Sequence, residues 1–258
     1  MFKSVLKKIL IGIWELRFLL RSIPYYLNAG KRMLPDYIII GAPKSGTTSL
    51  FEFLSRHPNV KNARMKEPRF FNRYYNLGLR YYRSYFPLIS SKVSTGEATT
   101  SYFYHSSTPI RIKHLLPKAK LILLLREPVS RAYSHFMMNR NDDPSASFVE
   151  ALRAESKGNV VYHYIDSSSY AKQLRRWMEH FDAHQILILK SEELFMQQEK
   201  CQHKLLSFLE LRQIELGPFK QLNDRKYTPL SNVDQEEAKT YFTEDLIELK
   251  ESFEISWK

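Results

Sequence analysis

A glycine-framed loop between an apolar run and an amphipathic segment is the feature that most limits how this chain can fold. The run at residues 36–41 reads DYIIIG, and the loop and helix start that follow read GAPKSGTTSL. A strand that leads through such a loop into a helix presents backbone N–H groups and the positive end of the helix dipole to a phosphate. Lys44 adds charge, and Thr47 and Thr48 add hydroxyl donors. The sequence therefore predicts a phosphate-binding loop.

The loop differs from the motif of nucleoside triphosphatases at one position. Gly41 and Gly46 have the spacing of the Walker A pattern G-x-x-x-x-G-K-[ST], but Thr47 stands where that pattern has lysine. The lysine lies inside the loop instead, at position 44. We interpret the loop as a relative of the P-loop that is poorly suited to hydrolyse triphosphates. The predicted cofactor-binding residues here are Lys44, Ser45, Gly46, Thr47, Thr48 and Ser49.

Short apolar runs alternate with helical stretches along the rest of the chain. Further β-like runs lie at residues 93–98, 120–126 and 185–190. Helical patterns lie at residues 47–56, 109–115, 129–139, 148–155, 168–181 and 197–209, and a final acidic helix is expected at about 234–254. Continuous apolar runs are typical of strands buried on both faces. The pattern predicts an α/β fold, with a P-loop-like parallel sheet flanked by helices on both faces and a ligand at the carboxyl ends of the strands.

Residues 1–34 are predicted to form a basic amphipathic helical segment ahead of a single domain at residues 35–258. Apolar side chains recur at helical spacing as far as Ile23, and charged residues interrupt every run long enough to span a bilayer. The segment is either a helix that packs on the domain or a peripheral membrane contact through residues 1–23. Because no export signal is recognised, we expect a cytoplasmic location, with or without that membrane contact.

The charge of the chain is strongly positive and unevenly placed. The net charge is +12, of which +6 falls in residues 1–35 and −5 in residues 234–258, which leaves +11 between them. A basic middle favours an anionic substrate, cofactor or surface, although a solvated basic surface would give the same count. Cys201 is the single cysteine, so an intrachain disulfide is excluded. No His or Cys cluster has ligand spacing, and no metal site is predicted.

An arginine and a serine lie eight residues apart around the end of the third predicted strand. The segment LILLLREPVSRAYSHF puts Arg126 at the end of the third predicted strand and Ser134 in the next helix. Together with GAPKSGTTSL, this pair resembles the signatures of the sulfotransferases that use 3′-phosphoadenosine 5′-phosphosulfate (PAPS). The resemblance implies that the loop binds the 5′-phosphosulfate. It also implies that Arg126 and Ser134 bind the 3′-phosphate of PAPS and of its product, 3′,5′-adenosine diphosphate (PAP).

Further segments resemble the heparan-sulfate-type branch of that family, which includes bacterial members. They are KEPRFF at residues 66–71, GLRYYRSYFP at 78–87, GEATTSYFYH at 96–105, SSYAKQLRRWMEHF at 168–181 and RKYTPLS at 225–231. The last segment implies that Arg225, Lys226 and Tyr227 cover the 3′-phosphate side of the nucleotide. The resemblance runs from about residue 35 to the C-terminus. It fails at Ala98, which follows Glu97 where many members of the branch have lysine.

The resemblance implies transfer of the sulfuryl group from PAPS to a hydroxyl or amine by in-line displacement, without a metal. Glu67 is then the base that takes the acceptor proton, and Lys44 lies beside the bridging oxygen of the leaving nucleotide. His105 is the rival base. The acceptor stays open between a small metabolite and a glycan, and no nucleic acid is expected. The other hypotheses are a nucleotide-dependent kinase and a non-enzymatic binding module for anionic polymers.

Overall fold

The computed structural model describes residues 24–140, 145–222 and 227–257, and its centre is a parallel sheet. The four strands are β1 (Tyr37–Gly41), β2 (Gly96–Ala98), β3 (Lys120–Leu125) and β4 (Ile186–Lys190), in the order β2-β1-β3-β4. Ile39 of β1 lies level with Ala98 on one side and with Ile122 on the other. The chain leaves β1 toward β2 and later returns past β1 to β3. The carboxyl ends of β1 and β3 therefore flank a switch point, where parallel sheets bind ligands.

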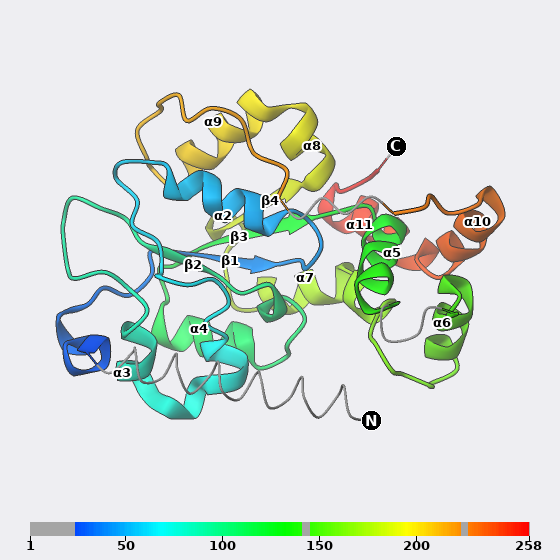
Figure 1. Cartoon of the computed structure of the whole chain (residues 1–258), viewed down its shortest axis with the longest axis horizontal. Coiled ribbons are helices and arrows are strands. Elements are labelled where there is room, and N and C mark those ends of the chain that lie inside the picture. The colour runs from blue at the N-terminus through cyan, green and yellow to red at the C-terminus, as the bar shows by residue number, and fades with distance from the viewer. Residues whose placement is uncertain (1–23, 141–144, 223–226, 258) are drawn as a thin grey trace.

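Helices cover both faces of the sheet (Figure 1). One face carries α2 (Thr47–Ser55), α8 (Ser191–Met196) and α9 (Gln198–Phe208), and the other carries α3 (Gly78–Arg83), α4 (Thr108–Leu115) and α7 (Ala171–Met178). Ile39 packs with Leu50 and Phe53 in one core, whereas its neighbour Ile38 lies in the opposite core with Trp177. Alternate residues of one strand thus serve two cores. The prediction of a parallel sheet with helices on both faces is confirmed.

The remaining helices form a third apolar cluster beside the carboxyl ends of the strands (Figure 1). They are α5 (Pro128–Asn139), α6 (Phe148–Ser156), α10 (Asn232–Thr240) and α11 (Thr243–Phe253). The prediction of one acidic helix over 234–254 is wrong, because the chain breaks at Tyr241 and Phe242. Phe242 is fully buried in the third cluster. Its burial lets α10 pack on α6 while α11 packs on α7.

The start of the described chain packs against the sheet domain. Ala29 is fully buried, and Met33 and Leu34 contact the core beneath the sheet. The predicted helix at residues 1–23 lies outside the described residues, and the domain boundary at residue 35 stays a prediction. Within the part of the chain that the structure describes, no helix has the length and apolar content needed to cross a membrane.

Candidate active site

The glycine loop joins β1 to α2 in the geometry that the sequence predicts. Gly46 caps the start of α2 with φ of 93°, a conformation that side chains disfavour, and a Cβ there would lie 3.4 Å from Leu124 and Phe195. The first turn of α2 has no side-chain cap. Its leading N–H groups are therefore available to an anion at the positive end of the helix.

A cavity of about 680 Å³ opens in front of this loop at the carboxyl ends of the strands. Eight of the predicted site residues line it: Lys44, Gly46, Thr47, Thr48, Glu67, Arg126, Ser134 and Tyr227. They come from four separate parts of the sequence. The fold therefore brings the loop, the Arg–Ser pair, the candidate base and the late tyrosine to one place.

Arg126 ties the second anion site to the loop. Its Nη1 donates to the backbone oxygen of Lys44 at 3.3 Å, and its own backbone oxygen accepts from the Tyr170 hydroxyl at 2.9 Å. Ser134 follows on α5 and is only 6% exposed. The start of α5 is fixed by Glu127, whose carboxylate caps the first turn of the helix. The guanidinium and the Ser134 side chain consequently face the same cavity as the loop.

The carboxylate of Glu67 is held in a defined position at the cavity wall. Glu67 has φ of 59°, and its N–H donates to the backbone oxygen of Ala98 at 2.8 Å. Oε1 accepts from the backbone N–H and the hydroxyl of Thr100, at 3.2 and 2.9 Å. Oε2 lies 3.6 Å from Nε of Arg69. One carboxylate oxygen is thus fixed by hydrogen bonds, and the other has a cation beside it.

A buried carboxylate in β2 braces the turn that carries Glu67. Glu97 is fully buried and accepts hydrogen bonds from the hydroxyls of Thr99 and Tyr102, at 2.6 and 3.1 Å. The Thr99 hydroxyl in turn accepts the backbone N–H of Arg69 at 3.3 Å. Burial raises the pKa of Glu97 to about 7, because desolvation outweighs these hydroxyl donors. The network links the sheet to the strained backbone around the candidate base.

Lys66 is a cavity residue that sequence analysis did not select. Its Nζ donates to the hydroxyls of Thr47 and Thr48, at 3.1 and 2.7 Å, and burial lowers the pKa of its ammonium group. It therefore puts a second lysine, after Lys44, at the start of α2. Its position next to Glu67 in KEPRFF was the one available signal. The sequence alone did not show that this segment folds back onto the loop.

His135 also lines the cavity without having been predicted. Burial, and then the field of the buried Arg131 guanidinium, lowers the pKa of His135 to about 3. Its Nδ1 lies 3.3 Å from Nη2 of Arg131. At neutral pH this imidazole is uncharged, and it stands next to Ser134 in the sequence.

Several predicted residues do not reach the cavity with their side chains. His105 is not among the lining residues, and its Nδ1 lies 3.2 Å from the Ser107 hydroxyl. Ser45 is fully buried, and the Ser49 hydroxyl accepts the backbone N–H of Leu222 at 3.1 Å. Arg225 and Lys226 lie outside the described residues. Their predicted contact with the nucleotide stays a prediction.

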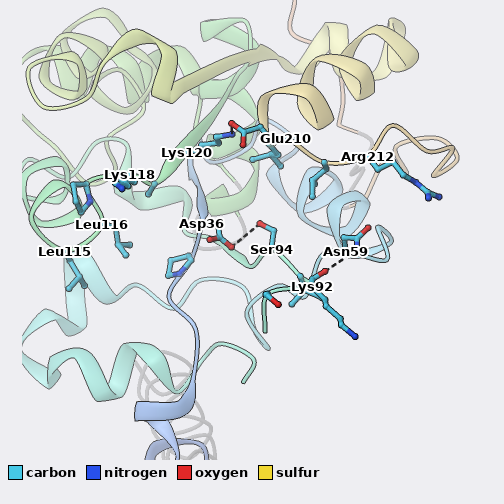
Figure 2. A pocket seen from close by; sticks show the side chains of 17 residues that line it. Asp36, Asn59, Lys92, Ser94, Leu115, Leu116, Lys118, Lys120, Glu210 and Arg212 are labelled. Carbon is cyan, nitrogen blue, oxygen red and sulfur yellow. Dashed lines mark hydrogen bonds and ion pairs between the residues drawn. The ribbon is translucent and has the colours of Figure 1, made fainter. Parts of the chain in front are cut away.

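A second hollow, of about 750 Å³, lies at the opposite, amino ends of the strands (Figure 2). Some of its charged side chains have partners within the hollow, and it is also lined by Lys92, Lys118 and Arg212. Nζ of Lys120 lies 2.7 Å from Oε1 of Glu210, and the Asp36 carboxylate accepts from the Ser94 hydroxyl at 3.1 Å. It contains no glycine loop. Among the described residues no group of His, Cys, Asp and Glu side chains could hold a metal ion. The cavity at the phosphate loop is therefore the candidate active site.

A parallel sheet with a glycine loop after β1 and an arginine after β3 defines a class of α/β proteins that bind a phosphorylated nucleotide at this edge. The sequence matches the sulfotransferase domain over residues 34–250. The chain therefore belongs to the sulfotransferase family. The predicted family and the single sulfotransferase domain are confirmed.

Curated relatives with similar sequences act on heparan sulfate, according to their names. Heparan sulfate glucosamine 3-O-sulfotransferase 3B1 of Mus musculus is 36% identical over 194 residues, covering 74% of this chain and 50% of the relative. The bifunctional heparan sulfate N-deacetylase/N-sulfotransferase 1 of Caenorhabditis elegans is 34% identical over 202 residues, covering 73% and 24%. The chain thus spans at most about half the length of these two relatives.

Solved structures share the fold at low sequence identity. A sulfotransferase from Alicyclobacillus acidocaldarius superposes with a TM-score of 0.72 at 23% identity, covering 87% of this chain and 98% of that one. Mouse sulfotransferase SULT7A1, solved with PAP, has a TM-score of 0.57 at 17% identity, covering 87% of each chain. These similarities confirm the fold of the whole domain.

Proposed function

We propose that this protein transfers the sulfuryl group of PAPS to a hydroxyl or amine of a glycan. The observation that carries the proposal is the pair of anion sites that face one cavity. The start of α2 suits the 5′-phosphosulfate, and Arg126 with Ser134 suits a separate 3′-phosphate. PAPS carries both groups, whereas ATP carries no 3′-phosphate. The PAP complex of a structural neighbour supports the same choice of nucleotide.

Three lining residues have different roles in an in-line displacement at sulfur. Lys44 stabilises charge that develops on the oxygen bridging sulfur and nucleotide, and Lys66 contacts the oxygens of the moving sulfuryl group. Glu67 accepts the proton of the acceptor as the new bond to sulfur forms. Its Oε2 accepts no hydrogen bond from the protein and lies 3.6 Å from Nε of Arg69. The bond between sulfur and the bridging oxygen breaks, and PAP leaves with that oxygen.

A glycan acceptor is favoured by the curated relatives, two of which are named for heparan sulfate. Arg69, which is 47% exposed beside Glu67, could pair with an acidic sugar. The test is transfer of radioactive sulfate from PAPS to an unsulfated uronic-acid glycan and, in parallel, to a small phenol. We expect label in the glycan. Label in the phenol alone would change the acceptor class, and no PAP release with either would contradict the function.

The 3′-phosphate site gives a prediction that separates binding from chemistry. Arg126→Ala should weaken the affinity for PAP by at least about tenfold, because a charge-assisted hydrogen bond to phosphate is lost. Ser134→Ala should weaken it less. Both changes should affect the affinity for 5′-AMP much less, because it has no 3′-phosphate. Calorimetric titration measures the affinity of each variant for each nucleotide. Equal losses of affinity for PAP and 5′-AMP would show that these residues do not bind the 3′-phosphate.

Lys66 gives a prediction on the transfer step. Lys66→Met keeps the length of the side chain and removes its charge, so turnover should fall by about tenfold to a hundredfold. Lys61→Met, at an exposed position five residues earlier, is the matched control and should keep normal turnover. Initial rates at saturating PAPS measure the effect. Normal turnover in Lys66→Met would remove this residue from the mechanism.

The remaining expectations are proposals from sequence. Transfer without a metal, a cytoplasmic location and a peripheral membrane contact through residues 1–23 all stay predictions. The kinase alternative requires the lysine that Walker A loops carry before their Ser or Thr, and Thr47 occupies that position. The binding-module alternative explains the positive charge, but it needs neither the phosphate loop nor Glu67.

A further inference from the structure

A patch of exposed apolar side chains gathers on one side of the molecule, remote from the candidate active site. Seventeen large apolar side chains are exposed among the described residues, and seven of them fall in three short segments. They are Tyr25, Tyr26, Leu27, Leu77, Leu79, Leu88 and Ile89, which we call the tyrosine–leucine patch. Leu27 and Ile89 are 69% and 66% exposed. Gathered apolar exposure of this kind marks an interaction surface.

The three segments form one connected surface. The N–H of Ile89 donates to the backbone oxygen of Lys31 at 2.9 Å, and Nη2 of Arg80 lies 3.5 and 3.4 Å from the backbone oxygens of Tyr26 and Leu27. In Figure 1 this surface lies at the lower left, where the blue start of the described chain meets α3. The strands point to the right in this view, and the residues that line the cavity follow their carboxyl ends. The patch and the cavity therefore face different directions.

The segments around the patch are basic and contain no acid. Residues 24–35 and 72–93 include no Asp or Glu. They carry Lys31, Arg32, Arg73, Arg80, Arg83 and Lys92. Tyrosine and leucine with interspersed lysine and arginine is the composition of surfaces that lie in the headgroup region of a bilayer.

We propose that the tyrosine–leucine patch docks on an anionic lipid bilayer. Apolar side chains enter the headgroup boundary, and the surrounding cations attract anionic lipids. The chain continues from Tyr25 into residues 1–23, which carry five basic side chains against Glu15. Packing residues 1–23 on the patch would bring two positively charged segments together. An anionic bilayer instead attracts both residues 1–23 and the basic segments around the patch. Docking leaves the cavity open to water, and it does not depend on the proposed sulfuryl transfer.

The test is co-sedimentation of the full chain with vesicles of phosphatidylcholine, with and without phosphatidylserine. The wild type should bind the anionic vesicles and bind the neutral ones much more weakly. The double variant Leu88→Ser, Ile89→Ser should lower the partition coefficient by at least about tenfold, because two exposed apolar side chains are removed. Val160→Ser, Val161→Ser is the matched control, since these side chains are 44% and 83% exposed elsewhere.

Charge is tested in the same assay. Lys31→Glu should lower anionic binding by about tenfold, and Lys172→Glu, on exposed α7 surface, should have a smaller effect. Thermal melting of each variant checks that the fold is kept. The proposal is overturned if the wild type does not co-sediment with anionic vesicles. It is equally overturned if the Leu88, Ile89 variant binds vesicles as well as the wild type, because binding then depends on residues 1–23 alone. It is also overturned if light scattering shows that the wild type is a dimer and this variant a monomer, because the patch is then a dimer interface.

Discussion

Replacing Glu67 by glutamine is expected to lower turnover by about two to four orders of magnitude. The amide keeps the shape of the side chain and can still accept from Thr100, but it cannot take a proton from the acceptor. The affinity for PAP should stay unchanged, because Glu67 contacts neither anion site. Initial rates and calorimetric titration of PAP measure the two quantities separately.

His105→Gln is the control for this experiment. His105 lies outside the cavity lining, so its replacement should leave turnover within about twofold of the wild type. An active Glu67→Gln together with an inactive His105→Gln would reverse the assignment of the base. If both variants stay active, the acceptor needs no base, as with an amine that binds already deprotonated.

Lys44→Ala should lower turnover by about a hundredfold or more, the loss expected when one donor to developing charge is removed. The structure places Lys44 on the cavity wall, with its backbone oxygen bound by Arg126. Alanine can keep that backbone contact, so the loop should hold its form. Steady-state rates with PAPS measure the loss, and circular dichroism checks the fold.

Lys118→Ala removes an exposed lysine at the opposite ends of the strands and serves as the matched control. It should leave turnover unchanged. Near-normal turnover in Lys44→Ala would contradict the role of the loop, and the same loss in both variants would indicate a general effect of charge.

The loop and the two central strands were predictable because their signals are local. DYIIIG and KLILLL are continuous apolar runs, and the glycine spacing of the loop is contained in six residues. Arg126 lies at a predictable strand end and Ser134 in the next predicted helix, but their selection as a pair required the family resemblance. Glu67 required the family resemblance, because nothing local distinguishes it from a surface glutamate.

Contacts between distant segments explain what the sequence did not reveal. The predicted strand at 93–98 shortens to Gly96–Ala98, because the Ser94 backbone pairs with Asn59 and Lys61. Lys66 reaches hydroxyls that lie eighteen and nineteen residues earlier in the chain. The uncharged state of His135 depends on burial that exists only in the folded protein.

The short helices α3 and α8 were also missed. Each has six residues, too few for a helical pattern to stand out from the surrounding sequence. Both are fixed by packing on the sheet domain, with Tyr82 and Leu194 fully buried at their centres. Helices of this length depend on tertiary contacts for most of their stability.

The most direct test of the central claim is calorimetric titration of the purified chain with PAP in the presence of EDTA. The pair of anion sites predicts tight binding of PAP without metal, much weaker binding of 5′-AMP, and no Mg²⁺-dependent binding of ATP. The same titration with Arg126→Ala should remove the preference for PAP over 5′-AMP. Binding of ATP that requires Mg²⁺, with no preference for a 3′-phosphate, would contradict the assignment.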